Sequence, residues 1–131
     1  MEQNFSILDT TLRDGLQGRR VPLDDKLEVL QRLDQAGIDV IEIAAVTSKP
    51  EDPESIRRAA EVIRNATVCI LAFPDPGAIE RAGQLLGSFG KPRMHVFNSV
   101  AVKEGTKASG SEMSSALEAI ADTVRRARAY R

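Results

Sequence analysis

The amino-acid sequence predicts an α/β fold in which four parallel strands alternate with four helices. Short apolar runs alternate four times with stretches of helical periodicity. The starts of successive strands lie roughly 26 to 34 residues apart, as in βα units with short loops. No glycine-rich phosphate loop follows any of the strands, which disfavours a dinucleotide-binding sheet. Because crossovers between parallel strands are right-handed, such a series of units forms a sheet that curls toward a barrel.

The first strand and the first helix are predicted at residues 5–8 and 24–36. Residues 5–8 are a short apolar run, which is typical of a strand. Asp24 is expected to cap the helix, and Gly37 to end it in the left-handed conformation that glycine tolerates. One face of the helix carries Leu27, Leu30 and Leu33.

The second unit begins with a strand at residues 39–45, whose nearly continuous apolar character suits a parallel strand covered on both sides. Asp52 and Pro53 are expected to open the second helix as its cap and its first-turn proline. The apolar residues of this helix recur at the helical period, at Ile56, Ala59, Ala60 and Ile63.

The third strand is predicted at residues 67–73, which are apolar and rich in β-branched side chains. Asp75 and Pro76 repeat the pairing of cap and first-turn proline at the start of the third helix. The inner face of this helix is expected to carry Ile79, Ala82 and Leu86.

The fourth strand is predicted at residues 93–98, after Lys91 and Pro92 break the chain. Residues 109–112, Ser-Gly-Ser-Glu, are similar to a capping box and should open the last helix. The inner stripe of this helix is expected to hold Met113, Ala116, Leu117, Ile120, Val124 and Ala127. Its solvent face ends in arginines that complement the helix dipole, namely Arg125, Arg126, Arg128 and Arg131.

The composition indicates one soluble domain over residues 1–131. A net charge of −1, with no basic run containing aromatic residues, argues against nucleic-acid binding. No apolar run approaches the ~20 residues of a membrane-spanning helix, and no signal peptide is expected at the start. Cys69 is the only cysteine and lies in an apolar run, so we expect a buried, unreactive thiol. These features fit a cytoplasmic protein without nucleic-acid or membrane partners.

The segment from Asp9 to Gln17, Asp-Thr-Thr-Leu-Arg-Asp-Gly-Leu-Gln, lies where the first strand gives way to the first helix. Ligands bind at this end of the strands in α/β sheets and barrels. Arg13 is suited to bind a carboxylate through two parallel hydrogen bonds. Asp14 is suited to bind a divalent cation, and Gly15 allows a tight turn. A surface ion pair beside a turn is the alternative interpretation.

Four further polar residues lie in or just after predicted strands. Glu42 lies within an apolar strand, where a carboxylate needs an ion-pair partner, possible in Arg13, or a ligand. His95, the only histidine, is either a hydrogen-bonded core residue or a ligand-binding one. Asn98 and Ser99 at the end of the fourth strand can bind a substrate carboxylate or start a turn.

The Asp-Thr-Thr-Leu-Arg-Asp-Gly sequence of residues 9–15 resembles the signature of the DRE-TIM metallolyase family. This family includes 2-isopropylmalate, homocitrate and citramalate synthases and 3-hydroxy-3-methylglutaryl-CoA (HMG-CoA) lyase. Leu16 and Gln17 look more like the lyase branch, whereas the segment from His95 to Ser99 is similar to the fourth strand of the synthases. The resemblance covers the chain and stops where a fifth strand would begin. It implies a (β/α)4 unit, the amino-terminal half of an HMG-CoA-lyase-like TIM (β/α)8 barrel.

The resemblance implies a Claisen condensation of acetyl-CoA with a 2-oxo acid, as in the 2-isopropylmalate synthases of leucine biosynthesis. Asp14 would bind a divalent metal, either Mg, Mn or Zn. Arg13 would stabilise the enolate-like oxygen. Glu42 and His95 would line the site as catalytic residues. Substrate would be bound by Arg13, Gln17, His95, Asn98 and Ser99.

The family's His-x-His metal motif does not occur in the sequence. We therefore expect an acyltransferase that is truncated and inactive alone, with weak or no metal binding. One alternative is a non-catalytic half-barrel that forms a homo-oligomer through its free strand edges. Another is a carbon–carbon lyase of the HMG-CoA lyase type.

Overall fold

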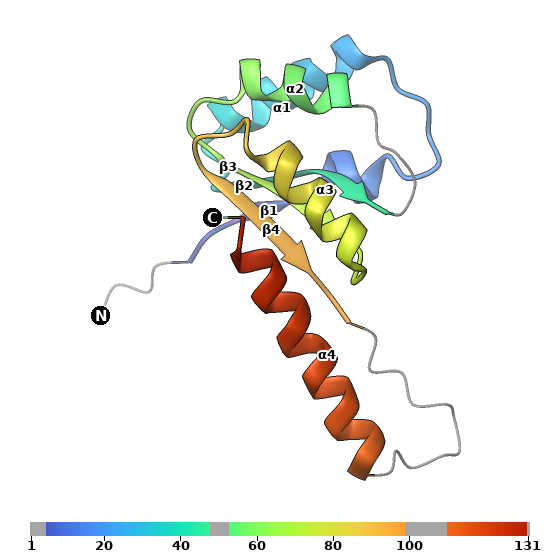
Figure 1. Cartoon of the computed structure of the whole chain (residues 1–131). Coiled ribbons are helices and arrows are strands. Elements are labelled where there is room, and N and C mark those ends of the chain that lie inside the picture. The colour runs from blue at the N-terminus through green and yellow to red at the C-terminus, as the bar shows by residue number, and fades with distance from the viewer. Residues whose placement is uncertain (1–4, 48–52, 99–109, 131) are drawn as a thin grey trace.

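The computed structural model describes residues 5–47, 53–98 and 110–130, and the side chains of 110–112 are not described (Figure 1). One sheet holds four strands in the order β1-β2-β3-β4, and each neighbouring pair is parallel. The strands are β1 (Leu8–Asp9), β2 (Val40–Val46), β3 (Thr67–Ala72) and β4 (Pro92–Val96). The helices are α1 (Leu23–Gln35), α2 (Pro53–Val62), α3 (Pro76–Leu86) and α4 (Gly110–Arg128), and a single π-helical turn, η1 (Thr11–Gly15), follows β1.

The helices form one layer along the sheet. Each helix contacts the next, α1 with α2, α2 with α3 and α3 with α4, and α1, α3 and α4 also contact the strands. Strands that follow one another in sequence order, with their helices side by side, are the arrangement of a (β/α) barrel rather than of a sheet wound in two directions. The predicted half-barrel of four βα units is therefore confirmed.

The hydrophobic core lies between the sheet and the helix layer. Its fully buried side chains come from β2, β3 and α3, and include Ile41, Val68, Ile70 and Ile79. Asp75 caps α3 as predicted, because its Oδ1 accepts a hydrogen bond from the Ala78 N–H at 2.9 Å. Gly37 has φ = 81° and ends α1, also as predicted.

Two predictions about the first unit are wrong. The first strand is Leu8–Asp9 rather than residues 5–8, and Phe5 is 83% exposed. Pairing begins only where Leu8 lies opposite Val40 on β2. Helix α1 begins at Leu23 after Pro22, so Asp24 lies in the first turn instead of capping the helix.

The other boundaries differ by one or two residues, and β4 ends at Val96 instead of residue 98. Helix α2 begins at Pro53, as expected, while the predicted cap Asp52 lies outside the described residues. The predicted capping box at residues 109–112 also falls outside the described side chains.

The predicted inner stripe of α4 is mostly exposed. Met113, Leu117 and Val124 are 51%, 59% and 41% exposed. The first half of α4 extends beyond the sheet, so only its last turns reach β4 and α3 (Figure 1). Ala127 packs against the core there. None of the helices in the described ranges is both long and apolar enough to cross a membrane.

Candidate active site at the carboxyl end of the strands

The turn η1 presents Arg13 and Asp14 directly above β1. The Asp9 carboxylate holds the turn, since it accepts hydrogen bonds from the Thr11 N–H at 3.0 Å and the Thr11 hydroxyl at 2.9 Å. Leu12 is buried and anchors the turn in the core. Single π-helical turns are frequent at functional sites. The left-handed glycine after this turn is Gly18, with φ = 75°, rather than Gly15.

Glu42 of β2 contacts candidate residues from both edges of the sheet, namely Arg13 after β1 and His95 on β4. Its side chain is fully buried, which requires charged or polar partners. One carboxylate oxygen, Oε2, accepts a hydrogen bond from Nε of Arg13 at 2.5 Å. The other oxygen, Oε1, lies 2.8 Å from Nδ1 of His95. The structure thus confirms the ion pair between Glu42 and Arg13 and joins both residues to His95.

His95 lies outside the hydrophobic core and is partly open to solvent. Its side chain is 43% exposed, although its ring is fixed by Glu42. A carboxylate only accepts hydrogen bonds, so Nδ1 of His95 carries the proton in this contact. In the neutral ring, Nε2 is then the acceptor nitrogen and is available to a ligand.

Cys69 of β3 lies beside the same carboxylate, with its Sγ 3.9 Å from Oε1 of Glu42. Burial, followed by the nearby charge of Glu42, raises the pKa of the Cys69 thiol to about 12. A thiol with this pKa is protonated near neutral pH, and the protonated form is a poor nucleophile. The expectation of a buried, unreactive cysteine therefore holds.

The remaining predicted residues belong to η1 or follow η1 and β4 in the sequence. Asp14 is 58% exposed and binds Nη1 of Arg13 at 2.9 Å. Gln17 is exposed and, with Arg13, lines a cavity of about 480 Å³. Asn98 is half-buried just beyond β4, whereas Ser99 lies outside the described residues. Leu16 packs against the core, which explains its apolar character.

The described residues do not by themselves form a metal site. Among them, no group of three or more His, Cys, Asp or Glu side chains is placed to hold an ion. Asp14 would supply one carboxylate ligand, and a hard cation needs several more oxygen ligands.

Two aromatic residues at this end of the sheet were not predicted from the sequence as part of the site. Phe73 follows β3 and Phe97 follows β4, and their rings meet edge to face with centroids 5.2 Å apart. Both are 38% exposed. The signal that could have found them is that each is an aromatic residue at the carboxyl end of a predicted strand.

The fold and this cluster define a (β/α)-barrel protein whose polar residues gather at the carboxyl ends of its strands, where such barrels carry their active sites. Comparison with protein families places the chain more closely. The HMGL-like family model matches residues 4–131, so the chain belongs to this family, the DRE-TIM metallolyases, which are metal-dependent enzymes.

Curated relatives agree with this assignment. A 2-isopropylmalate synthase of Thiobacillus denitrificans is 35% identical over 99% of this chain and 26% of its own length. One from Caulobacter vibrioides is 35% identical over 95% of this chain and 24% of its own length. One from Rhodopirellula baltica is 44% identical over 72% of this chain and 18% of its own length. The chain thus spans about a quarter of the length of the curated relatives that it matches.

Proposed function

We propose that this chain carries the substrate-binding half of an acyltransferase of the 2-isopropylmalate synthase type, which condenses acetyl-CoA with a 2-oxo acid. The observation that carries the proposal is the bridge formed by Glu42. This one buried carboxylate binds both the guanidinium of Arg13 and the imidazole of His95. The similarity to 2-isopropylmalate synthases supports the same reaction class.

In this reaction a proton leaves the methyl group of acetyl-CoA, and the resulting carbanion forms a carbon–carbon bond with the carbonyl carbon of the 2-oxo acid. The carbonyl electron pair moves onto oxygen, which then takes up a proton. Water finally hydrolyses the thioester and releases the CoA thiol. Arg13 is placed to stabilise the negative oxygen, because fixed donors aimed at developing charge stabilise a transition state.

The hydrogen-bonding capacity of Arg13 supports this role. Among the described residues, Nε of Arg13 bonds to Glu42 and Nη1 bonds to Asp14, which leaves Nη2 for a substrate oxygen. His95 would contact the substrate through Nε2, while Glu42 acts as a positioning residue because it is fully buried. Gln17, Asn98 and Ser99 would bind the substrate carboxylate.

We also propose that Asp14 is one ligand of the family's divalent ion, with Mg, Mn and Zn as the candidates. When bound, such an ion would supply polarisation of a carbonyl group. Because Asp14 is the single carboxylate ligand proposed among the described residues, the affinity of this chain for the ion should be weak or absent.

The function is tested by titrating the chain with pyruvate, a 2-oxo acid, followed by NMR. The Arg13→Lys variant keeps the charge but loses the planar fork, so we expect roughly tenfold weaker binding. Arg32→Lys is the matched control, since Arg32 is an exposed arginine paired with Glu28 on α1. Equal binding by the wild-type chain and Arg13→Lys, or no binding of pyruvate at all, would refute the proposal.

We further propose that the chain forms a homo-oligomer. In the described sheet β1 and β4 are edge strands, and unpaired edges recruit other strands. Two copies joined through these edges would provide the eight strands of a closed barrel. The exposed Met113 and Leu117, on the part of α4 that extends beyond the sheet, add apolar surface to the chain.

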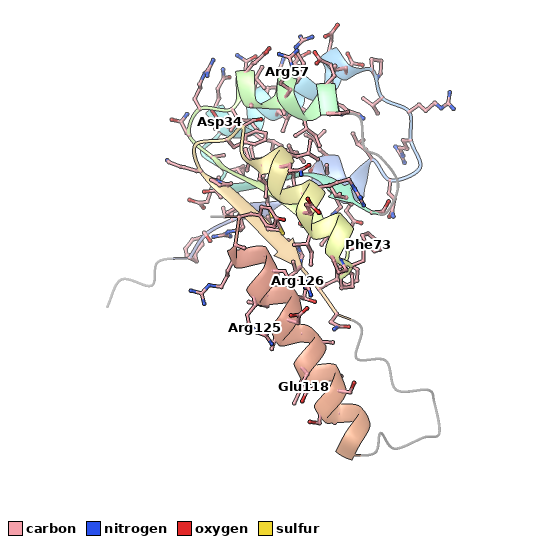
Figure 2. All side chains as sticks on the ribbon, in the orientation of Figure 1. Asp34, Arg57, Phe73, Glu118, Arg125 and Arg126 are labelled. Carbon is pink, nitrogen blue, oxygen red and sulfur yellow. The ribbon has the colours of Figure 1, made fainter. Side chains whose placement is uncertain are left out.

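Sedimentation equilibrium tests the association. We expect a dimer or larger assembly, and we expect Leu117→Glu to weaken it by placing a charge on the apolar surface. Glu118→Gln on the same helix is the control, because Glu118 is already polar and exposed (Figure 2). A stable, well-folded monomer at all concentrations would rule out this proposal.

A further inference from the structure

Two apolar side chains just before β1 are largely open to solvent. Phe5 is 83% exposed and Ile7 is 49% exposed. The Val40 N–H of β2 donates to the Ile7 carbonyl at 3.1 Å, so this segment continues the path of β1 along the sheet. Asp9 is paired with Ile41, whose side chain belongs to the core between the sheet and the helices. Because side chains alternate along an extended chain, Ile7 and Phe5 lie on that same helix side of the sheet.

The opposite edge of the sheet carries an apolar groove on its helix side. Figure 1 shows the last turns of α4 beside β4 and α3. A cavity of about 340 Å³ lies at this place, and we call it the α4 groove. Its apolar lining includes Leu86, Met94, Val96, Val124, Ala127 and Tyr130. Met94 and Val96 also pack against the core, which places the groove on the helix side of β4.

The charges of the groove and of the segment before β1 are complementary. Arg93 and Arg128 line the groove, and neither forms an ion pair with another of the described residues. By contrast, Arg126 on the same helix binds Asp122. Residues 5–9 carry one carboxylate and no basic side chain. Unpaired guanidinium groups favour the approach of an acidic segment and oppose that of a basic one.

A barrel closed by two copies would bring these two surfaces together. β1 of one copy then lies beside β4 of the other, because these strands are the two edges of the sheet. Both apolar surfaces lie on the helix side, so they face each other across the new strand pair. Resting on the proposed homo-oligomer, we infer that the α4 groove of one copy receives Phe5 and Ile7 of a second copy. The twofold relation gives the dimer two such contacts.

Substitutions on each side of the contact test this inference by sedimentation equilibrium. Phe5→Lys and Val124→Glu should each weaken self-association roughly tenfold or more, because each places a charge in an apolar contact. Both side chains are exposed in the single chain, so the circular dichroism spectrum should not change. Ser115→Glu is the control, because the exposed Ser115 lies about two and a half helical turns before Val124 and therefore on the opposite face of α4.

Mixing the two variants tests whether the two surfaces meet each other. A dimer of either variant alone has both contacts damaged. A mixed dimer has one undamaged contact, and its other contact places Lys at position 5 against Glu at position 124. We therefore expect the mixture to associate at concentrations at which each variant alone is monomeric. A mixture of Phe5→Lys with Ser115→Glu has no such complementary pair and is the control for this experiment.

A fluorescent probe reports on the contact directly. The chain contains no tryptophan, so Phe5→Trp introduces a single one. Its emission should shift to shorter wavelength as the protein concentration rises, because the indole leaves water and enters the groove. Adding Val124→Glu to this variant should remove the shift, whereas adding Ser115→Glu should leave it in place.

The outcomes separate this contact from the homo-oligomer on which it rests. A wild-type chain that stays monomeric would refute both proposals together. A wild-type dimer whose association is unchanged by Phe5→Lys would overturn the contact and leave the homo-oligomer intact. The contact is also overturned if the mixed variants stay monomeric, or if the tryptophan emission does not respond to concentration while the chain associates.

Discussion

Replacing Arg13 with alanine is expected to lower the free energy of unfolding by about 3 kcal/mol, because the change leaves a buried carboxylate without its charged partner. Glu42 has no exposed surface and would keep only His95 and the weak Cys69 contact. Urea unfolding followed by circular dichroism measures the loss.

A matched variant separates the effect of burial on stability from the effect of losing any ion pair. Arg57→Ala removes an exposed arginine of α2 that is paired with Glu54 and Glu61 (Figure 2). We expect no measurable change, since water screens such pairs. Adding Glu42→Gln to Arg13→Ala should recover part of the lost stability, and double-mutant coupling energies of neighbours reach roughly 0.5–3 kcal/mol. If Arg13→Ala is no more destabilising than Arg57→Ala, the bridge does not stabilise the fold.

Replacing Asp34 with alanine is expected to lower the free energy of unfolding by a similar amount, about 3 kcal/mol. Asp34 of α1 is buried and holds the loop between α2 and β3. Its carboxylate accepts hydrogen bonds from the N–H groups of Arg64, Asn65 and Ala66 at 3.1, 2.9 and 2.7 Å, and from the Asn65 side chain at 3.2 Å. The variant leaves these donors without an acceptor.

Asp34 also makes stability depend on pH. Burial acts to raise the pKa of Asp34, but the bonds from Ala66, Asn65 and Arg64 outweigh it and hold the pKa below the usual 3.8. As pH falls, the unfolded chain therefore takes up this proton first. The stabilisation is complete above pH 3.8 and is lost as the pH falls through the lower pKa of the folded state.

Urea unfolding measured between neutral and acidic pH tests this direction of the change in stability with pH. Asp34→Asn should lower stability at neutral pH and show a smaller further loss in acid than the wild-type chain. Asp25→Asn, an exposed change on the same helix, should follow the wild-type curve. Identical acid dependence of the wild-type chain and Asp34→Asn would mean that another carboxylate carries the effect.

Much of the fold was predictable from local chemistry. Asp75 and Pro76 open α3, and Gly37 closes α1, because caps and left-handed glycines act within a few residues. The apolar runs of β2 and β3 identified buried parallel strands in the same way. The strand predicted at residues 5–8 was wrong, because a strand also needs a pairing partner, and pairing begins only at Leu8.

The candidate site was predictable as a set of residues but not as a geometry. Arg13, Asp14, Glu42 and His95 were recognisable by residue type and by their positions after or within predicted strands, and the family resemblance implied their roles in the site. Their connection through the two oxygens of Glu42 joins residues that are 29 and 53 positions apart, which no local pattern encodes. The exposure of the apolar stripe of α4 was not predictable for the same reason. Helical periodicity identifies an apolar face but not the element that covers it.

By itself, the sequence determined the order of the strands and helices, the parallel half-barrel and the chemical groups at the carboxyl ends of its strands. The order of the elements follows from periodicity, capping and turn chemistry, which depend on neighbouring residues, whereas the half-barrel is what the resemblance to the DRE-TIM metallolyases implied. Only the tertiary structure decided that Glu42 binds Arg13 and His95 together and that Phe73 meets Phe97. These contacts depend on the register between separate strands, which is set when the sheet and its helices pack together.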